Sequence, residues 1–391
     1  MIHPRLIASE GIRNAGPIFT DADLRQLLVD TQTLVDSSSE TRALPDIERT
    51  AELLQELFQP HMEVELRQTE LGPVVIGRPK EGTPSILLIG HYDTVVPVSK
   101  AGGYREEGNQ IYGAGISDMK ASLAMALAIA RKYSEMGRSI PFTLFIVPDE
   151  EIGSPESAPI LDQIALGHKV ALILEPVSAI GEYVLARRGL FYFSVKAKGK
   201  DCHTGLSFDR ADALLAAAKF IIEIARWHNP GKHFSTNAIL DPQSLAAKGN
   251  RVEGRARLIG EVRTGSDADL ARFVEWLRLR VADSGVDGVT LELDVPDKGQ
   301  SYPVVITDAT RAYEQVLIAA MEHVGLRPTC VPAHQRGASD LNRLRGAIPG
   351  LDGLGTVGLG AHTETEWIDR PALLIRTAFL WALLQTISSS G

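Results

Sequence analysis

Apolar and polar residues alternate along the first part of the chain in patterns that predict helices and strands in turn. Leucines recur at helical spacing within residues 20–58, which predicts two helices, and a nearly all-apolar stretch predicts a longer helix over 119–136. The segments with the pattern of strands are 64–68, 74–77, 86–89, 142–147 and 171–174. The segment Ile86–Ile89 is apolar throughout, which indicates a strand buried on both faces. This alternation predicts an α/β fold with a mixed, largely parallel sheet covered by helices.

The pattern changes near residue 190. Residues 190–198 alternate between apolar and polar positions, as in a strand with one exposed face. The predicted elements that follow are a helix over 209–227, two strands within 235–263, a helix over 267–282 and a strand over 289–295. This order is typical of a ferredoxin-like α+β module with both helices on one face of the sheet. Because the α/β pattern returns at about 303, the sequence predicts one domain formed by 1–189 and 303–391, interrupted by an inserted domain over 190–302.

The composition narrows the class of protein. The chain has 391 residues, and 40 Lys and Arg against 49 Asp and Glu give a formal net charge of −9. Proteins that bind nucleic acid or anionic membranes carry a positive patch, so we expect neither partner. The two cysteines, Cys202 and Cys330, form no C-x-x-C pair and no disulfide framework. The N-terminus lacks the apolar run of a signal peptide, and the run Ala121–Ala130 is shorter than the ~20 residues of a membrane span. We therefore expect a cytoplasmic protein.

Two polar residues follow directly after the buried strand over 86–89. His91 and Asp93 stand two positions apart, so in extended backbone their side chains point to the same side. The carboxyl end of a strand is where open α/β sheets commonly place ligands. The alternative is a buried histidine with an ordinary hydrogen-bond partner and an aspartate that forms a turn.

Asp118 begins the long apolar helix, after two glycines at 113 and 115. For this residue taken alone we expect a helix N-cap, the usual role of an aspartate at that position. The glycines match part of a dinucleotide-binding loop, but Asp118 stands where the third glycine of G-x-G-x-x-G would be. A carboxylate there would repel a pyrophosphate, so a dinucleotide site is not expected.

Further acids follow the next two strands. Asp149, Glu150 and Glu151 are consecutive and repel one another unless they are solvated in a turn or neutralised by a cation. Glu175 follows the strand over 171–174, where the alternative is an exposed strand end or a paired acid. His362 lies in a glycine-rich loop before the last predicted helix, where the alternative is a surface histidine or one with an ordinary partner.

Together these separate loops supply two imidazoles, one aspartate and two glutamates as candidate metal ligands. Nitrogen and oxygen ligands without a thiolate suit zinc, manganese or cobalt. Three ionised carboxylates opposite two divalent cations leave a net charge of about +1, and a bridging hydroxide would bring it to about zero. This count favours a site of two divalent metal ions with one shared carboxylate over a single-metal site.

The motifs are also recognisable as a set. They are Gly90-His-Tyr-Asp-Thr-Val95, Gly113-Ala-Gly-Ile-Ser-Asp-Met-Lys120, Pro148-Asp-Glu-Glu-Ile-Gly-Ser154, Leu174-Glu-Pro176, Cys202-His-Thr-Gly205 and His362. In order and spacing, over roughly residues 20–388, the chain resembles the dinuclear zinc amidohydrolase and exopeptidase family. This family includes acetylornithine deacetylase, succinyl-diaminopimelate desuccinylase, aminoacylase and glutamate carboxypeptidase. The chain is most similar to the glutamate-carboxypeptidase-like branch, because position 175 holds Glu rather than Asp.

The resemblance implies a metal-binding role for five residues. His91 and Glu175 would bind one zinc ion, Glu151 and His362 would bind the other, and Asp118 would bridge both.

The resemblance implies catalytic roles as well. Glu150 would be the general base that takes a proton from the attacking water and passes it to the leaving nitrogen. Asp93 would orient the imidazole of His91. The peptide bond after Asp118 is often cis in this family.

The resemblance further implies a lid and dimerisation role for the inserted domain. His203 would reach the active site of the partner subunit and donate a hydrogen bond to the oxyanion. Asn250, Arg263 and the segment Arg336-Gly-Ala-Ser-Asp340 align loosely with positions that bind a substrate carboxylate, for which arginine is well suited. The chain departs from the family here, because the usual proline soon after Asn250 is absent and Ala338 replaces a common glycine. We expect a homodimer through this domain, because the exposed edge of its sheet needs cover.

The resemblance implies a metal-dependent hydrolase that cleaves the amide C–N bond of a peptide or N-acyl amino acid bearing a carboxylate. One alternative is an aminohydrolase or deaminase that acts on a non-peptide C–N bond, in an aromatic amine or ureido substrate, with the same metal site. Another is a metal-free binding protein on the same scaffold. A serine hydrolase is not expected, because the sequence has no G-x-S-x-G motif.

Overall fold

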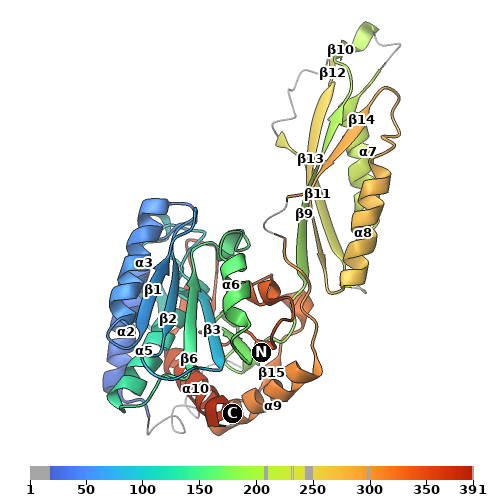
Figure 1. The fold of residues 1–391 in the computed structure, drawn as a ribbon. Coiled ribbons are helices and arrows are strands. Elements are labelled where there is room, and N and C mark those ends of the chain that lie inside the picture. The colour runs from blue at the N-terminus through green and yellow to red at the C-terminus, as the bar shows by residue number, and fades with distance from the viewer. Residues whose placement is uncertain are drawn as a thin grey trace. The chain divides into compact units, whose positions relative to one another are not determined.

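The computed structural model describes residues 18–206, 210–229, 231, 233–242, 250–296 and 300–389. These residues form two compact units (Figure 1). The first unit holds the described residues up to Ala186, Ile306–Gln335 and the residues from Ser339 onward, and the second holds Arg187–Val305 and Arg336–Ala338. The first unit is therefore discontinuous in sequence. The catalytic and lid roles assigned to the two predicted domains remain predictions.

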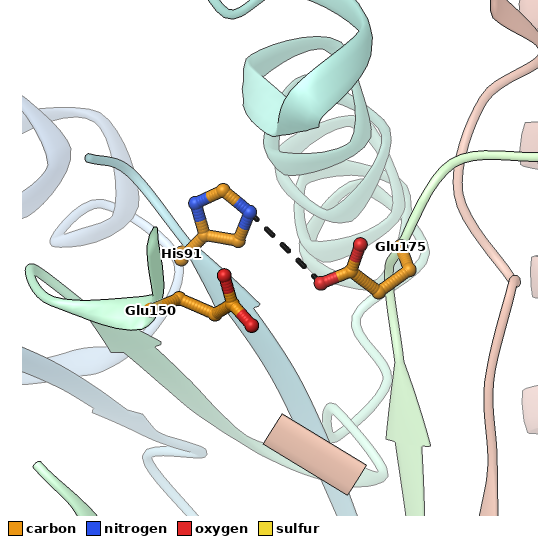
Figure 2. A group of neighbouring side chains, drawn as sticks. All are labelled: His91, Glu150 and Glu175. Carbon is orange, nitrogen blue, oxygen red and sulfur yellow. Dashed lines mark ion pairs between the residues drawn. The ribbon is translucent and has the colours of Figure 1, made fainter. Parts of the chain in front are cut away.

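The first unit is built around a six-stranded sheet in the order β1-β2-β6-β3-β7-β16. Its strands are β1 (Glu63–Arg67), β2 (Val74–Arg78), β3 (Ile86–His91), β6 (Phe142–Val147), β7 (Val170–Ile173) and β16 (Gly350–Leu351). The pairs β6–β3, β3–β7 and β7–β16 are parallel and the other two are antiparallel, which confirms the predicted mixed, largely parallel sheet. Because β3, β6 and β7 run in the same direction, His91, Glu150 and Glu175 come together at their carboxyl ends (Figure 2).

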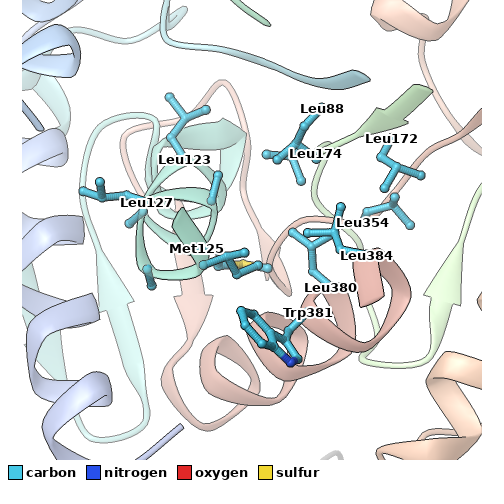
Figure 3. Packing of buried hydrophobic residues seen from close by; sticks show 14 of the residues in the cluster. Leu88, Leu123, Met125, Leu127, Leu172, Leu174, Leu354, Leu380, Trp381 and Leu384 are labelled. Carbon is cyan, nitrogen blue, oxygen red and sulfur yellow. The ribbon is translucent and has the colours of Figure 1, made fainter. Parts of the chain in front are cut away.

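Helices of the first unit bury a large apolar cluster against this sheet. They are α2 (Asp21–Asp36), α3 (Leu44–Phe58), α4 (Val98–Ala101), α5 (Ala121–Glu135), α6 (Ala158–Ala165), α9 (Asp308–His323) and α10 (Arg370–Ser389). Leu88 of β3 lies in the same buried cluster as Leu123 of α5 and Leu380 of α10 (Figure 3). The neighbouring Leu87 and Ile89 point to the other face and are fully buried too. Strand β3 is thus buried on both faces, as its all-apolar sequence predicts.

Helix α10 is long enough and apolar enough to cross a membrane, judged by length and composition alone. However, 67% of its most apolar window is buried inside the protein. Arg376 on this helix is fully buried and donates hydrogen bonds to the carbonyl oxygens of Gly355, at 2.7 Å, and Ile180, at 3.1 Å. A buried guanidinium that is satisfied by protein carbonyls is a feature of a core helix.

Several short strands of the first unit were not predicted from the sequence. They are β4 (Arg105–Glu107), β5 (Gln110–Tyr112), β17 (Gly358–Leu359) and β18 (Trp367–Asp369) in one antiparallel sheet, and the parallel pair β8 (Glu182–Tyr183) and β15 (Thr329–Cys330). Strands of two or three residues are too short to show an alternating pattern. The order β17-β18-β5-β4 brings the loop after β5, which carries Asp118, next to the loop between β17 and β18, which carries His362.

The second unit is an antiparallel sheet with helices against one face. Its main elements are β9 (Gly189–Lys198), α7 (Ala213–Ala225), β11 (Ser235–Leu240), β13 (Arg255–Thr264), α8 (Asp267–Arg280) and β14 (Thr290–Asp294), with the short pair β10 (Cys202–His203) and β12 (Arg251–Val252). The strand order β11-β13-β9-β14 confirms the predicted ferredoxin-like α+β fold. Phe193 of β9 is buried in one cluster with Phe220 of α7 and Phe273 of α8.

Two predicted helix starts were wrong. Helix α7 begins at Ala213, where the side chain of Asp212 accepts a hydrogen bond from the N–H of Leu215 at 3.0 Å and caps the helix. Residue 209 itself lies outside the described residues, but residues 210–212 are described and are not helical, so the predicted helix started too early. Helix α5 begins at Ala121 rather than at 119, because residues 118 and 119 have non-helical backbone angles.

Candidate active site

Two groups of potential metal ligands share His91 at the carboxyl end of β3. In the first group, ligand atoms of His91, Glu150 and Glu175 all lie within 4.8 Å of one another. Nε2 of His91 is 3.9 Å from Oε1 of Glu175 (Figure 2). Glu150 lies in the turn after β6 and Glu175 just beyond β7, so the parallel strands themselves bring the three residues together.

In the second group, His91 meets Asp118 and Glu151, again with ligand atoms within 4.8 Å. Oδ1 of Asp118 is 3.0 Å from Nε2 of His91. The helix-cap interpretation of Asp118 was wrong, because α5 begins at Ala121 without a side-chain cap. The Asp118–Met119 peptide bond is cis, as the resemblance implied.

His362 reaches the same site from the loop between β17 and β18. Its Nε2 lies 2.9 Å from Oε2 of Glu151 and 3.4 Å from Oδ2 of Asp118. Asp118 therefore directs one carboxylate oxygen toward His91 and the other toward His362. The structure thus brings together all five residues predicted to hold metal ions, with His91 beside Glu175 and His362 beside Glu151.

The acids of the site lie close enough to disturb one another. Burial raises the pKa of Glu150 well above its usual range, and the neighbouring carboxylate of Glu175 adds to this shift. Burial also raises the pKa of Glu151, although its contact with His362 opposes the shift. Carboxylates in this arrangement keep their charge only beside positive charge, which bound divalent cations supply.

The two imidazoles lie between these acids. Burial opposes a positive charge on His91, but its contacts with Asp118 and Asp93 outweigh burial and raise the pKa well above the usual value. Contacts with Asp118 and Glu151 raise the pKa of His362 to about 10. Burial alone would raise the pKa of Asp118, but the two histidines lower it below its usual range. The site therefore favours positive charge at its centre, as a cation-binding site does.

The chemistry of the donors fits divalent metal ions. The groups consist of imidazole nitrogens and carboxylate oxygens, and neither cysteine belongs to them. Oε1 of Glu151 is buried and has no hydrogen-bond partner among the residues that the structure describes. A buried carboxylate oxygen without a partner is costly unless an ion or ligand meets it. The residues thus fit a metal site, and the identity of the metal remains a prediction.

Asp93 contacts more than the imidazole that it was predicted to orient. Nδ1 of His91 is 3.0 Å from the backbone oxygen of Asp93 and 3.5 Å from its carboxylate. The carboxylate also accepts hydrogen bonds from the backbone N–H groups of Glu150 and Glu151, each at 3.2 Å. The hydroxyl of Thr41 donates to it at 2.9 Å. Asp93 therefore holds the turn that carries the two glutamates, and Thr41 was missed because it lies in no motif.

Two further buried acids, Glu366 and Asp340, support the loops of the site, and this supporting role was not predicted from the sequence. Glu366 accepts hydrogen bonds from backbone N–H groups of the loop that carries Asp118. Asp340 accepts a hydrogen bond from the hydroxyl of Ser154, in the turn after Glu151, and burial raises its pKa to about 6. An acid in a polar loop gives no sign in the sequence that it is buried, so no motif could have found these residues.

The remaining predicted site residues belong to the second unit. His203 is exposed on β10, and Asn250 directly precedes β12, which pairs with β10. Arg263 on β13 forms an ion pair with Glu261 at 2.9 Å. Arg336 also lies in this unit. The structure thus brings His203 and Asn250 close together, and the functional roles of the four residues remain predictions.

The fold and the site define a class of metallohydrolases in which an α/β sheet presents acids and histidines at the ends of its parallel strands. The chain belongs to peptidase family M20/M25/M40, whose model matches residues 87–386. Membership confirms the resemblance seen in the motifs and the predicted class of enzyme, a dinuclear metal-dependent amidohydrolase or metallo-exopeptidase.

The individual relatives have low sequence identity to this chain, but the matches cover most of both chains. Carboxypeptidase G2 from Pseudomonas sp. (strain RS-16) is 23% identical over 314 residues, which cover 78% of this chain and 74% of the relative. Among solved structures, aminopeptidase PepT from Bacillus cereus ATCC 10987 has a TM-score of 0.74 at 23% identity and covers 93% of this chain and 98% of its own. The YXEP protein of Bacillus subtilis, described as a dinuclear metal binding peptidase from the M20 family, has a TM-score of 0.67 at 16% identity, with 95% and 100% covered. At these identities the solved structures establish the shared fold and leave the substrate open.

Proposed function

We propose that this protein is a metal-dependent hydrolase that cleaves an amide C–N bond in a small substrate bearing a carboxylate. The observation that carries the proposal is the position of Asp118, whose two oxygens face His91 and His362. One carboxylate so placed can be shared by two cations, with Glu175 beside the first imidazole and Glu151 beside the second. We therefore propose two divalent ions, most simply zinc, with manganese or cobalt as substitutes. When bound, the ions would lower the pKa of the attacking water and polarise the scissile carbonyl group.

Glu150 is the residue that we assign as the general base. Its carboxylate lies in the first ligand group with His91 and Glu175, yet the proposed pairs of ligands do not use it. A carboxylate oxygen of Glu150 would take a proton from the attacking water and donate it to the leaving nitrogen. Asp93 supports this role, because its carboxylate holds the backbone N–H of Glu150 at 3.2 Å.

The second unit is proposed to bind substrate. His203 of the partner subunit would donate a hydrogen bond to the oxyanion. Asn250, Arg263 and Arg336 would bind the substrate carboxylate, for which the planar guanidinium offers two parallel hydrogen bonds. A homodimer through this unit is supported by its sheet, in which β11 and β14 are edge strands within the described residues.

A cytoplasmic location is also proposed. Both Cys202 and Cys330 are free thiols, which persist in a reducing compartment. The net charge of −9 supports a small-molecule substrate rather than a nucleic acid or an anionic membrane as the partner.

The proposal is tested by metal analysis combined with a substrate panel. Mass spectrometry of the purified chain should find divalent metal, and the panel should contain dipeptides, N-acyl amino acids, N-carbamoyl amino acids and aromatic amines. We expect hydrolysis of a dipeptide or an N-acyl amino acid. Turnover confined to N-carbamoyl or aromatic amine substrates would replace the proposal with the aminohydrolase alternative. A protein that takes up no metal and binds these compounds without turnover would be a binding protein.

A further inference from the structure

Glu366 is a buried carboxylate that receives several hydrogen bonds from one distant loop. Its Oε1 accepts hydrogen bonds from the N–H groups of Ser117, at 2.7 Å, and Asp118, at 2.8 Å. Its Oε2 accepts a third from the N–H of Gly115 at 3.0 Å. The side chain of Glu366 is thus the acceptor for three backbone donors of the loop that precedes α5.

Part of the backbone of this loop is satisfied by Glu366 and part by other backbone groups. Asp118 and Met119 have non-helical angles within a single π-type turn over Ile116–Lys120, in which the N–H of Lys120 bonds to the carbonyl oxygen of Gly115 at 2.9 Å. The N–H groups of Gly115, Ser117 and Asp118 bond to Glu366 instead. The loop is also tightly packed, because a Cβ added at Gly115 would lie 2.2 Å from Cγ2 of Thr94. On another side, a Cβ added at Gly358 of β17 would lie 2.4 Å from Oγ of Ser117. Buried N–H groups need an acceptor, and here Glu366 provides it.

The same loop decides where Asp118 points. Its backbone N–H is fixed by Glu366, while its two carboxylate oxygens lie 3.0 Å from Nε2 of His91 and 3.4 Å from Nε2 of His362. A movement of the loop would therefore change both of these distances. Glu366 is also on the loop that carries His362, so a single carboxylate ties together two of the segments that form the site.

We propose that Glu366 is a positioning residue that fixes the loop of Asp118, so that this aspartate can be shared by two metal ions. The inference rests on the metal centre of the proposed function. Glu366 itself binds no metal in this account, because its two oxygens are occupied by backbone N–H groups. Its contribution is to the geometry of the centre and not to the chemistry of the reaction.

The test measures cobalt(II) binding by the 391-residue chain after removal of metal with a chelator. Glu366→Gln keeps the shape of the side chain but replaces one acceptor oxygen with an amide nitrogen, which cannot accept from an N–H group. We expect at least tenfold weaker binding of cobalt(II) and an altered visible absorption spectrum. Glu364→Gln is the matched control, since Glu364 is exposed in the same loop, and it should bind cobalt as the unmodified chain does.

Glu366→Asp separates geometry from charge, because it keeps the charge and both oxygens but shortens the reach. We expect at least threefold weaker binding and a shifted spectrum, and this variant decides the matter if Glu366→Gln does not fold by circular dichroism. A Glu366→Asp protein with the cobalt affinity and spectrum of the unmodified chain would overturn the positioning role. If the unmodified chain takes up no cobalt, both the metal centre and the positioning role of Glu366 are overturned. If the unmodified chain binds cobalt and the Glu366 variants bind it equally well, only the positioning role is overturned.

Discussion

Nε2 of His362 lies 2.9 Å from Oε2 of Glu151, although the whole second unit separates these residues along the chain. The contact joins the loop between β17 and β18 to the turn after β6. Because Asp118 lies within 3.4 Å of the same imidazole, the three residues form one half of the candidate metal centre.

Substitution of His362 should therefore abolish binding of the metal ion in this half of the centre, while the other ion remains bound. We expect His362→Ala to reduce the bound divalent metal from about two ions to about one per chain, because the ligands around His91 remain. Metal analysis by mass spectrometry measures the stoichiometry. His323→Ala is the control, since His323 is exposed at the end of α9. A His362→Ala protein that retains both ions would contradict the assignment of this residue.

Glu150→Gln should separate metal binding from turnover. The amide keeps the size of the side chain but cannot take up a proton, so kcat should fall by about 10²- to 10⁴-fold, the usual contribution of a general base. The metal content should stay at that of the unmodified chain. Steady-state kinetics and metal analysis on the same preparation check both statements, and a nearly normal kcat would remove Glu150 from the mechanism.

Metal removal should lower the thermal stability of the chain as well as its activity. The acids of the site repel one another, and an ion that binds only the folded protein stabilises it by mass action, by about 2.7 kcal/mol at a free concentration of 100 Kd. We expect the midpoint of thermal unfolding to fall in EDTA and to recover when zinc is added back. Equal midpoints in both conditions, at a pH where the chain is folded, would argue against a metal centre in this protein.

The hydroxyl of Thr41 should contribute to stability through Asp93. Thr41→Val removes the donor at 2.9 Å from Oδ2 of Asp93 and should lower the free energy of unfolding by about 1 kcal/mol. Urea unfolding of the metal-free chain measures this change. Thr33→Val is the control, because the exposed hydroxyl of Thr33 bonds to the carbonyl oxygen of Val29 in its own helix, and its effect should stay within about 0.5 kcal/mol. Equal losses in the two variants would show that the contact with Asp93 has no special weight.

The proposed role of His203 across a dimer can be tested by mixing two inactive variants. His203→Ala and Glu150→Gln should each lose activity, but a mixed dimer would hold one site with an intact Glu150 and an intact His203 of the partner subunit. Random exchange makes half of the dimers mixed, so activity should recover to about a quarter of that of the unmodified protein. Mixtures that stay inactive while sizing shows subunit exchange would place His203 outside the neighbouring site.

The sequence predicted the parts of the site that follow from local pattern. His91 and Glu175 stand at the ends of strongly apolar strands, so both the strands and the polar residues after them are readable. Asp118 shows the limit of this reasoning, because an aspartate before an apolar helix has the same local pattern whether it caps the helix or faces a metal. Only the geometry of the loop, with non-helical angles at Asp118, distinguishes the two roles.

The features of the fold and the site that were not predicted depend on contacts between segments that are distant in sequence. Thr41 bonds to Asp93, and Glu366 bonds to the loop before α5, and neither contact leaves a trace in the local sequence. The strands β4 and β5 are equally hidden, because three residues cannot show a period. The second unit was more predictable, since its strand β9 is ten residues long and alternates clearly.

The insertion of the second unit also determines the order in which the candidate metal ligands are synthesised. Four of the five candidate metal ligands, up to Glu175, precede Arg187, whereas His362 follows the second unit and emerges from the ribosome after it. Domains tend to fold as they leave the ribosome, so the second unit is continuous enough to fold while the first still lacks β16 and α10. A nascent chain therefore displays only four of the five candidate metal ligands while the second unit is being synthesised. Full loading with metal must therefore wait until the loop that carries His362 has been synthesised, after the second unit.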